Sequence, residues 1–233
     1  TESRHSVRMS VLDYSLVGKK WLKSKKLSPD AFAQLGFHLA YFDIHGHVPV
    51  TYESVMMKHF KYGRTETGRP MTEEASQFVE LMSDPLASVE DKAAAIRAAA
   101  DAHVAQIKNC QAGRGFDRHL FALKNLAKLR MERLDEYKIP EIFTHQSYAV
   151  CSSFLLSTSN CGMDGVSSFG FGPVCEGGYG VGYMIADDRI MANISSWSVV
   201  GPMQSELFKR KLAKAYTDMY RILEAPSSTG KTP

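Results

Sequence analysis

Several features that would assign a protein to a class at once are missing from this sequence of 233 residues. Its 28 Lys and Arg residues are nearly balanced by 25 Asp and Glu residues, which gives a net charge of +3. Nucleic-acid-binding domains normally carry a strongly basic face, so we expect no nucleic-acid partner. No apolar run reaches the ~18 residues of a membrane-spanning helix, and the amino-terminal stretch lacks the apolar region of a signal peptide. We therefore expect no transmembrane segment in this chain.

Signatures of metal sites and of activated nucleophiles are also missing. The four cysteines lie far apart without a Cys-x-x-Cys pair, which argues against a zinc site and a disulfide framework and fits a reducing compartment. No serine stands in a Gly-x-Ser-x-Gly turn. The glycine-rich stretch 167–183 does not lead into Gly-Lys-Ser/Thr, so close packing or close approach of a ligand explains its glycines better than a nucleotide loop.

Helical patterns are the clearest signal that is present. Ser28 as N-cap, Pro29 in the first turn and Gly46 at the end predict a helix between them. Further helices are expected near 72–83, over 88–109 and over 117–137. A final amphipathic helix is expected over 205–225. Five of its residues are expected to face the core: Leu207, Leu212, Ala215, Met219 and Ile222.

Strand patterns alternate with these helices. Residues 48–54 read as a strand in which Val48, Val50 and Tyr52 alternate, and β-type runs follow at 149–159, 180–186 and 190–199. The order predicts an α/β fold with a mixed β-sheet flanked by helices. The 44% of hydrophobic residues is enough for a substantial core. We expect a single domain over 1–224 and a flexible tail over 225–233.

Three polar segments are candidates for binding. Lys19 and Lys23 lie four residues apart on one helix face, which suits a phosphate or pyrophosphate but is also common on a solvated surface. Arg118, at a helix start beside Asp117, can hold a carboxylate through two hydrogen bonds, or it can form an Asp–Arg pair that ties the helix to a loop. The hydroxyls at 157–159 end an apolar run, as they would in an edge strand whose hydroxyls are satisfied locally.

Taken in order, these segments resemble the carnitine and choline acyltransferase family. The matching stretches are GKKWLKSKKLSPDAF, VPVTYES, GRTETGRP, GFDRHLFALK, LSTSN and GFGPV…GYGVGY, between residues 19 and 197. The resemblance implies one half of a two-domain fold like that of chloramphenicol acetyltransferase, with the active site in a tunnel between the halves. It also implies reversible acyl transfer between coenzyme A and carnitine. Both are substrates, so no separate cofactor is implied.

The resemblance implies a role for each matching side chain. Lys19 and Lys23 match residues that meet the coenzyme A phosphates, and Asp30 matches an aspartate near the adenosine or pantetheine part. For carnitine, three residues match the groups that hold the carboxylate: Tyr52, Thr65 and Arg118. Their chemistry suits this role, since two hydroxyls and a guanidinium satisfy the oxygen lone pairs and offset the charge.

The catalytic hydroxyls and the acyl pocket are implied in the same way. Ser157 and Ser159 match the family's STS motif, whose second serine lies near the developing oxyanion. Phe171 matches an aromatic residue beside the trimethylammonium group. Two residues before it, Phe169 matches the position that limits acyl length, which favours short or medium acyl groups. A shift of the loop by one residue would put Gly170 there instead.

Two substitutions and one absence depart from the family pattern. Gly177 replaces a usual aspartate, and Asn160 follows STS where glutamine or threonine is more usual. The His-x-x-x-Asp-Gly motif that supplies the general base does not occur. We therefore expect a carboxyl-terminal part of a longer mitochondrial or peroxisomal enzyme of fatty acid metabolism, whose amino-terminal part carries the base. A non-catalytic module of the same fold and a choline acyltransferase are the alternatives.

Overall fold

The computed structural model describes residues 7–134, 136–162, 165–198 and 204–226. Its strands are β1 (Val7–Tyr14), β2 (Thr51–Met56), β3 (Thr65–Gly68), β4 (Leu156–Asn160), β5 (Tyr179–Ile185) and β6 (Ile190–Trp197). The α-helices are α1 (Lys19–Ser24), α2 (Pro29–His45), α3 (Glu73–Ser83), α4 (Val89–Asn109), α5 (Asp117–Met131), α6 (Gln146–Cys151) and α7 (Gln204–Glu224). Two short helical turns, η1 (Cys110–Arg114) and η2 (Glu141–Phe143), complete the described elements.

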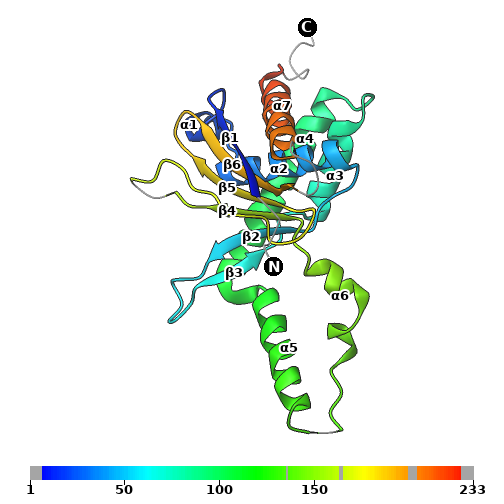
Figure 1. The fold of residues 1–233 in the computed structure, drawn as a ribbon. Helices are drawn as coiled ribbons and strands as arrows, with labels where there is room; N and C mark the ends of the chain where they lie inside the picture. The colour runs from blue at the N-terminus through cyan, green and yellow to red at the C-terminus, as the bar shows by residue number, and fades with distance from the viewer. Residues whose placement is uncertain (1–6, 135, 163–164, 199–203, 227–233) are drawn as a thin grey trace.

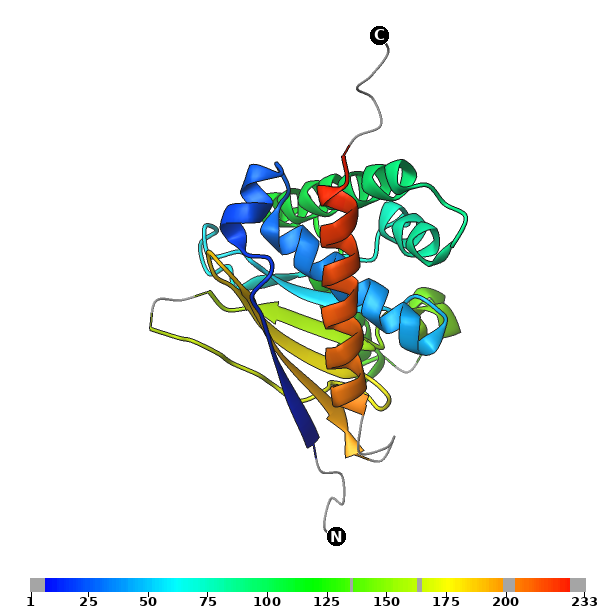
Figure 2. The ribbon, with the colours of Figure 1, turned by 90° about the horizontal axis from the view of Figure 1, so that it is seen from above.

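The strands form one mixed sheet in the order β1-β6-β5-β4-β2-β3. Only the pairs β2–β4 and β4–β5 are parallel. Helices α2, α3, α4 and α7 form a layer on one side of the sheet, and α5 points away from that layer (Figures 1 and 2). The predicted α/β fold with a mixed sheet flanked by helices is therefore confirmed.

The capping residues predicted the ends of two helices correctly. The Ser28 hydroxyl accepts a hydrogen bond from the Ala31 N–H, and Gly46 closes α2 with a left-handed φ of 72°. Ser88 caps α4 in the same way through the Asp91 N–H. Because α2 is buried along most of its length between the sheet, α4 and α7, it forms the centre of the hydrophobic core.

The strand predicted at 48–54 has the wrong start and the wrong buried face. It begins at Thr51, and Val48 is exposed. The residues that face the helices are Thr51, Glu53 and Val55, so Tyr52 points to the other side. The reason is a tertiary contact, because the carboxylate of Glu53 is buried against His103 of α4.

Other predicted boundaries also needed correction. Helix α5 ends at Met131, six residues before the predicted end at 137. The run 149–159 is a strand only from Leu156, because α6 occupies its start. In α7 the deeply buried side chains include Phe208 and Leu223, whereas the predicted Leu207 and Ile222 are only partly buried.

Two expectations concern the chain ends and the membrane. The tail expected over 225–233 lies, from residue 227 on, outside the described residues. Within the described part of the chain, every helix is too short or too polar to cross a bilayer.

Candidate active site

Three side chains predicted to bind one carboxylate lie together at the root of α5. The Arg118 guanidinium donates from Nη2 to the Thr65 hydroxyl at 3.2 Å and to the Tyr52 hydroxyl at 3.3 Å. Its Nε donates to the Thr65 carbonyl at 3.2 Å. Among the described residues, no carboxylate lies within ion-pair distance of this exposed guanidinium. A cation surrounded by hydroxyls in this way is suited to an anionic ligand.

The start of α5 is held so that Arg118 is free for that role. Asp117 accepts two hydrogen bonds from Arg69, at 2.9 and 2.6 Å, and thereby fixes the helix to the segment after β3. The Arg118 N–H donates to the Glu66 carboxylate at 3.2 Å. An Asp–Arg pair thus does tie the helix to a loop, as one of the two interpretations held, but the arginine is Arg69.

The candidate serines stand beside this group on the same face of the sheet. Tyr52 pairs with Ser157 across β2 and β4, and Ser157 pairs with Gly180 of β5. Ser159 lies two residues further along β4, where it pairs with Gly182. Since paired residues share a face, Tyr52, Ser157 and Ser159 point to the side opposite the helix layer, which we call the open face. Strand β4 lies inside the sheet, so the edge-strand interpretation is wrong.

A loop covers part of the open face and needs the glycines of β5. A Cβ on Gly180 would lie 2.7 Å from the Phe171 carbonyl oxygen, and one on Gly182 would lie 2.6 Å from that of Phe169. The same two carbonyls accept hydrogen bonds from Ser195 and Asn193 of β6. The glycines therefore permit close backbone packing, as their pattern predicted. Phe169 and Phe171, on the loop that packs against β5, are half-buried.

The residues proposed for coenzyme A lie at two places. Lys19 and Lys23 are one turn apart on the short helix α1, with Lys23 exposed and Lys19 partly buried. Asp30 is in the first turn of α2, and its Oδ1 accepts hydrogen bonds from Tyr183 at 2.7 Å and from Asn160 at 3.1 Å. Asn160 thus links Asp30 to the strand that carries Ser159.

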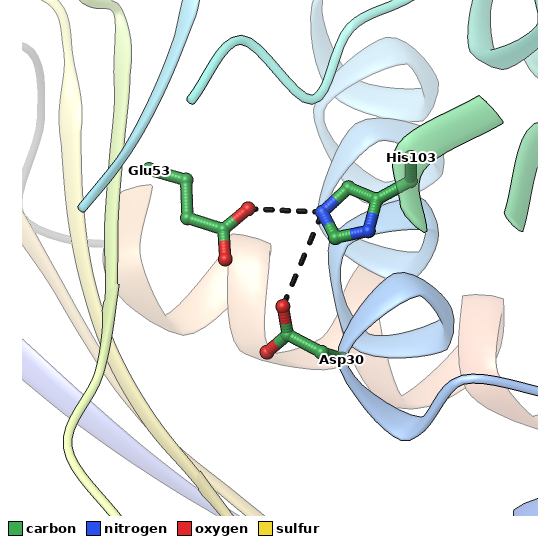
Figure 3. Close-up of side chains that lie close together, drawn as sticks. All are labelled: Asp30, Glu53 and His103. Carbon is green, nitrogen blue, oxygen red and sulfur yellow. Dashed lines mark hydrogen bonds and ion pairs between the residues drawn. The ribbon is translucent and has the colours of Figure 1, made fainter. Parts of the chain in front are cut away.

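Asp30 also belongs to a cluster that the sequence did not reveal. The His103 Nε2 lies 2.9 Å from the Glu53 carboxylate and 4.0 Å from that of Asp30. Figure 3 shows both carboxylates directed at this one nitrogen. Burial raises the pKa of Glu53 to about 7; the bond from His103 opposes this, and the Asp30 charge adds to it. The cluster therefore gains or loses a proton near neutral pH.

Two carboxylates and an imidazole are also ligands that metal ions use in proteins. One ligand atom from each lies within 4.8 Å of the others. A metal-bound histidine normally donates its second ring N–H to a partner. The His103 Nδ1, however, is buried without a hydrogen-bond partner among the described residues. The cluster is thus better suited to sharing a proton than to binding a metal.

A chain of buried hydrogen bonds connects the helix layer to the candidate strands. Gln34 of α2 donates to the Thr158 hydroxyl at 2.9 Å and to Tyr183 at 3.1 Å. Thr158 in turn donates to the Tyr52 carbonyl at 2.8 Å. Thr158, which lies between the two candidate serines, thus fixes the positions of β4 and β2 from the side of the sheet that faces the helices. The alternation of the STS segment predicted that Thr158 points to the opposite side from the two serines, but only the fold reveals that Gln34 is its partner.

Comparison with known proteins decides the family. The family model described as "Choline/Carnitine o-acyltransferase" matches residues 2–214. The chain belongs to this family. It is 38% identical to the carnitine O-acetyltransferase of Columba livia over 219 residues, which cover 94% of this chain and 34% of that protein. It is also 34% identical to the peroxisomal carnitine O-octanoyltransferase of Bos taurus, covering 94% and 36% of the two chains.

A third relative extends the range of acyl groups. Carnitine O-palmitoyltransferase 2, mitochondrial, of Mus musculus is 36% identical over 225 residues, covering 94% of this chain and 32% of its own. The chain thus spans about a third of the length of these relatives. Among solved structures, a wax ester synthase/diacylglycerol acyltransferase from Marinobacter aquaeolei VT8 matches 94% of this chain and 50% of its own, at 9% identity and a TM-score of 0.49. A score at that level supports no conclusion about function.

The two departures from the family pattern have local explanations. Gly177 has a left-handed φ of 71°, a conformation that glycine adopts freely and that aspartate tolerates better than most residues. Asn160 uses its amide to bond Asp30, so it retains a donor at this position.

Proposed function

We propose that this chain is part of a carnitine O-acyltransferase that moves an acyl group reversibly between coenzyme A and carnitine. The observation that carries the proposal is the Arg118 guanidinium, placed 3.2 and 3.3 Å from two hydroxyls. A guanidinium and two hydroxyls match the charge and the lone pairs of a carboxylate. Carnitine has a carboxylate and choline has none, which favours carnitine over choline as the acceptor.

The open face supports roles for the remaining residues of the carnitine side. With the carboxylate held at Arg118, the acceptor hydroxyl would attack the thioester carbonyl in a single ternary complex, without an acyl-enzyme. Ser159, with Ser157, would donate to the oxyanion that forms there, which typically lowers such barriers by ~3 kcal/mol. Phe171, on the loop beside these serines, would lie against the trimethylammonium group.

Coenzyme A would be held from the two lysines of α1 and from the first turn of α2. Lys19 and Lys23 offer two ammonium groups to its phosphates, and Asp30 offers a carboxylate to the adenosine or pantetheine part. The hydrogen bonds from Tyr183 and Asn160 support this role for Asp30, because they hold its side chain in one orientation at the end of β4.

We further propose that the general base lies in an amino-terminal part outside residues 1–233, and that residues 1–224 form a single domain. The relatives are about three times as long as this chain, which leaves room for such a part. The full-length protein would then be the enzyme, in mitochondria or peroxisomes, as the names of its relatives suggest. A non-catalytic module with the same fold is the second candidate.

The acyl preference is proposed to be short or medium. Phe169 stands two residues before Phe171, and its ring would fill the volume of several methylene groups of a long tail. The Phe169 carbonyl accepts a hydrogen bond from Asn193, and the Phe171 carbonyl accepts one from Ser195. These two bonds fix the loop on β6, which favours Phe169 over Gly170 as the residue at the acyl pocket.

The test is the substitution Arg118→Ala in the full-length polypeptide. Loss of a charge-assisted pair worth ~1.5–3 kcal/mol should raise the KM for carnitine about 10- to 150-fold and leave that for acyl coenzyme A nearly unchanged. Arg114→Ala is a matched control, because Arg114 is exposed and bonds only Asn109 in the described structure. Equal effects of Arg118→Ala on both substrates would mean that Arg118 is structural.

A further inference from the structure

The buried carboxyl group of Glu53 has two neighbours that its proton can face. The Glu53 Oε2 lies 2.9 Å from the His103 Nε2, and one Glu53 oxygen lies within 4.8 Å of a carboxylate oxygen of Asp30. In Figure 3 the second oxygen of Glu53 lies on the side of Asp30. Glu53 is only 5% exposed, so its ionisation beside another carboxylate is costly. A neutral Glu53 is therefore a hydrogen-bond donor inside the cluster.

The ring of His103 indicates which neighbour the Glu53 proton faces. The His103 Nδ1 is buried without a hydrogen-bond partner in the described part of the chain. If Glu53 donated its proton to Nε2, the ring N–H would be at Nδ1, and a buried N–H without an acceptor is rare in folded proteins. If Nε2 carries the ring hydrogen instead, it donates to the Glu53 Oε2, and Nδ1 is only an unpaired acceptor. The proton of a neutral Glu53 then belongs on its other oxygen, beside Asp30.

Asp30 can accept this hydrogen bond. Its Oδ1 already accepts from Tyr183 at 2.7 Å and from Asn160 at 3.1 Å. Its Oδ2 lies 4.0 Å from the His103 Nε2, which is too far for a hydrogen bond. A carboxylate offers about four lone pairs, so a bond from Glu53 would leave one of them for a ligand. The Asp30 side chain is 32% exposed and can be reached by such a ligand.

We propose that neutral Glu53 is a positioning residue, which donates a hydrogen bond to Asp30 and holds that carboxylate in one orientation for coenzyme A. This inference rests on the proposed function, in which Asp30 meets the adenosine or pantetheine part. When Glu53 loses its proton, the donor is lost and a second negative charge faces Asp30. Two carboxylates this close repel each other, so Asp30 turns away or takes up a proton itself. Either change weakens the contact with coenzyme A.

The other titratable side chains around Glu53 come from the elements packed against β2. They are Asp30 on α2, His103 on α4 with His38 of α2 beside it, Tyr183 on β5, Glu66 on β3 and Cys110 on η1. Burial raises the pKa of Tyr183 and of Cys110 above their usual values and lowers that of His38 to about 3, so these three do not titrate between pH 6 and 8. We therefore expect the charge beside Asp30 to change in this range when Glu53 loses its proton.

Calorimetric titration of the full-length polypeptide with coenzyme A at pH 6 and pH 8 tests the proposal. The variant Glu53→Gln has an amide donor that cannot ionise. The wild type should bind as tightly as this variant at pH 6 and about tenfold more weakly at pH 8, because a group with a pKa of about 7 is mostly ionised there. Titration of coenzyme A itself cancels in the ratio. Glu53→Leu, which has no donor, should bind weakly at both pH values. Glu80→Gln, the same change at an exposed site on α3, is the control and should follow the wild type.

Two results of the titration would overturn the proposal. One is an equal pH dependence of the wild type and Glu53→Gln, and the other is tight binding by Glu53→Leu at pH 6. A second measurement needs neither ligand nor variant: carboxyl carbon-13 NMR of the 233-residue chain at pH 6 should show a protonated Glu53 and an ionised Asp30. The opposite assignment would also overturn the proposal. A protonated Glu53 in a wild type that binds no coenzyme A at either pH would retain the hydrogen bond to Asp30 and refute the proposed function.

Discussion

Two buried titratable side chains should shift the stability of this fold in opposite directions as the pH changes. Burial raises the pKa of Glu53 from its ordinary 4.5 to about 7. Burial, and to a lesser extent the neighbouring His103, lowers the pKa of His38, on α2, from 6.5 to about 3. Both ring nitrogens of His38 are buried without a hydrogen-bond partner among the described residues, so its cationic form is strongly disfavoured.

The signs follow from which state binds more protons. Between about pH 4.5 and 7 the folded chain keeps the Glu53 proton that the unfolded chain has lost, so the free energy of unfolding falls as the pH rises. Between about pH 3 and 6.5 the unfolded chain protonates His38 and the folded chain does not, so the free energy of unfolding rises with pH. Each slope is ~1.4 kcal/mol per pH unit. Between about pH 4.5 and 6.5 the two contributions cancel.

Single substitutions should reveal how each residue changes the free energy of unfolding with pH. Relative to the wild type, Glu53→Gln should gain ~3 kcal/mol in the free energy of unfolding as the pH rises from 4.5 to 6.5, whereas His38→Leu should lose ~3 kcal/mol over the same window. Urea unfolding of the three proteins at pH 4.5, 5.5 and 6.5 measures this, and titrating groups that do not interact with Glu53 or His38 cancel in the differences. Parallel pH profiles for the wild type and Glu53→Gln would refute the reasoning.

Three further predictions concern catalysis and the loop over the open face. The 233-residue chain alone should show no thiol release from acetyl or octanoyl coenzyme A with carnitine, because a general base typically contributes ~10²–10⁴-fold; turnover at the full-length rate would contradict this. In the full-length enzyme, Phe169→Gly should raise kcat/KM for palmitoyl relative to acetyl coenzyme A, since each newly buried methylene is worth ~0.8 kcal/mol; a wild type that already prefers palmitoyl would disprove the steric argument. Gly182→Ala should cost ~1–3 kcal/mol of stability in chemical denaturation, because its Cβ would lie 2.6 Å from the Phe169 carbonyl oxygen. Gly172→Ala is the control, with its nearest contact at 3.7 Å, and an equal loss in both would exclude close packing as the cause.

Local chemistry was enough to predict most of the helices. Ser28, Pro29 and Gly46 act within a few residues of the helix ends they define, so their meaning could be read without the fold. Strand β2 shows where such reasoning stops. Its alternation favoured burying Tyr52, but a histidine 50 residues further along the chain accommodates Glu53 inside and leaves Tyr52 on the open face.

The candidate site also has a part that could be predicted from the sequence and a part that could not. Tyr52, Thr65 and Arg118 were predicted from their resemblance to a family, and the structure brings them within hydrogen-bonding distance. The pair formed by Glu53 and His103 was not predicted, because nothing near either residue indicates the other. A buried carboxylate next in sequence to a tyrosine that is proposed to bind carnitine is a signal only once the strand register is known.

Under the proposed function, the hydrogen bonds from β6 to the loop over the open face would separate two kinds of substrate recognition. Phe169 and Phe171 are held by Asn193 and Ser195, whereas Tyr52, Thr65 and Arg118 belong to β2, β3 and α5 at the other end of the sheet. In the proposed enzyme, a change of side chain at 169 would therefore alter the room for the acyl tail without moving the groups that grip the acceptor. Selection could then retune tail length by a few substitutions on one loop. Relatives named for acetyl, octanoyl and palmitoyl transfer are 38%, 34% and 36% identical to this chain.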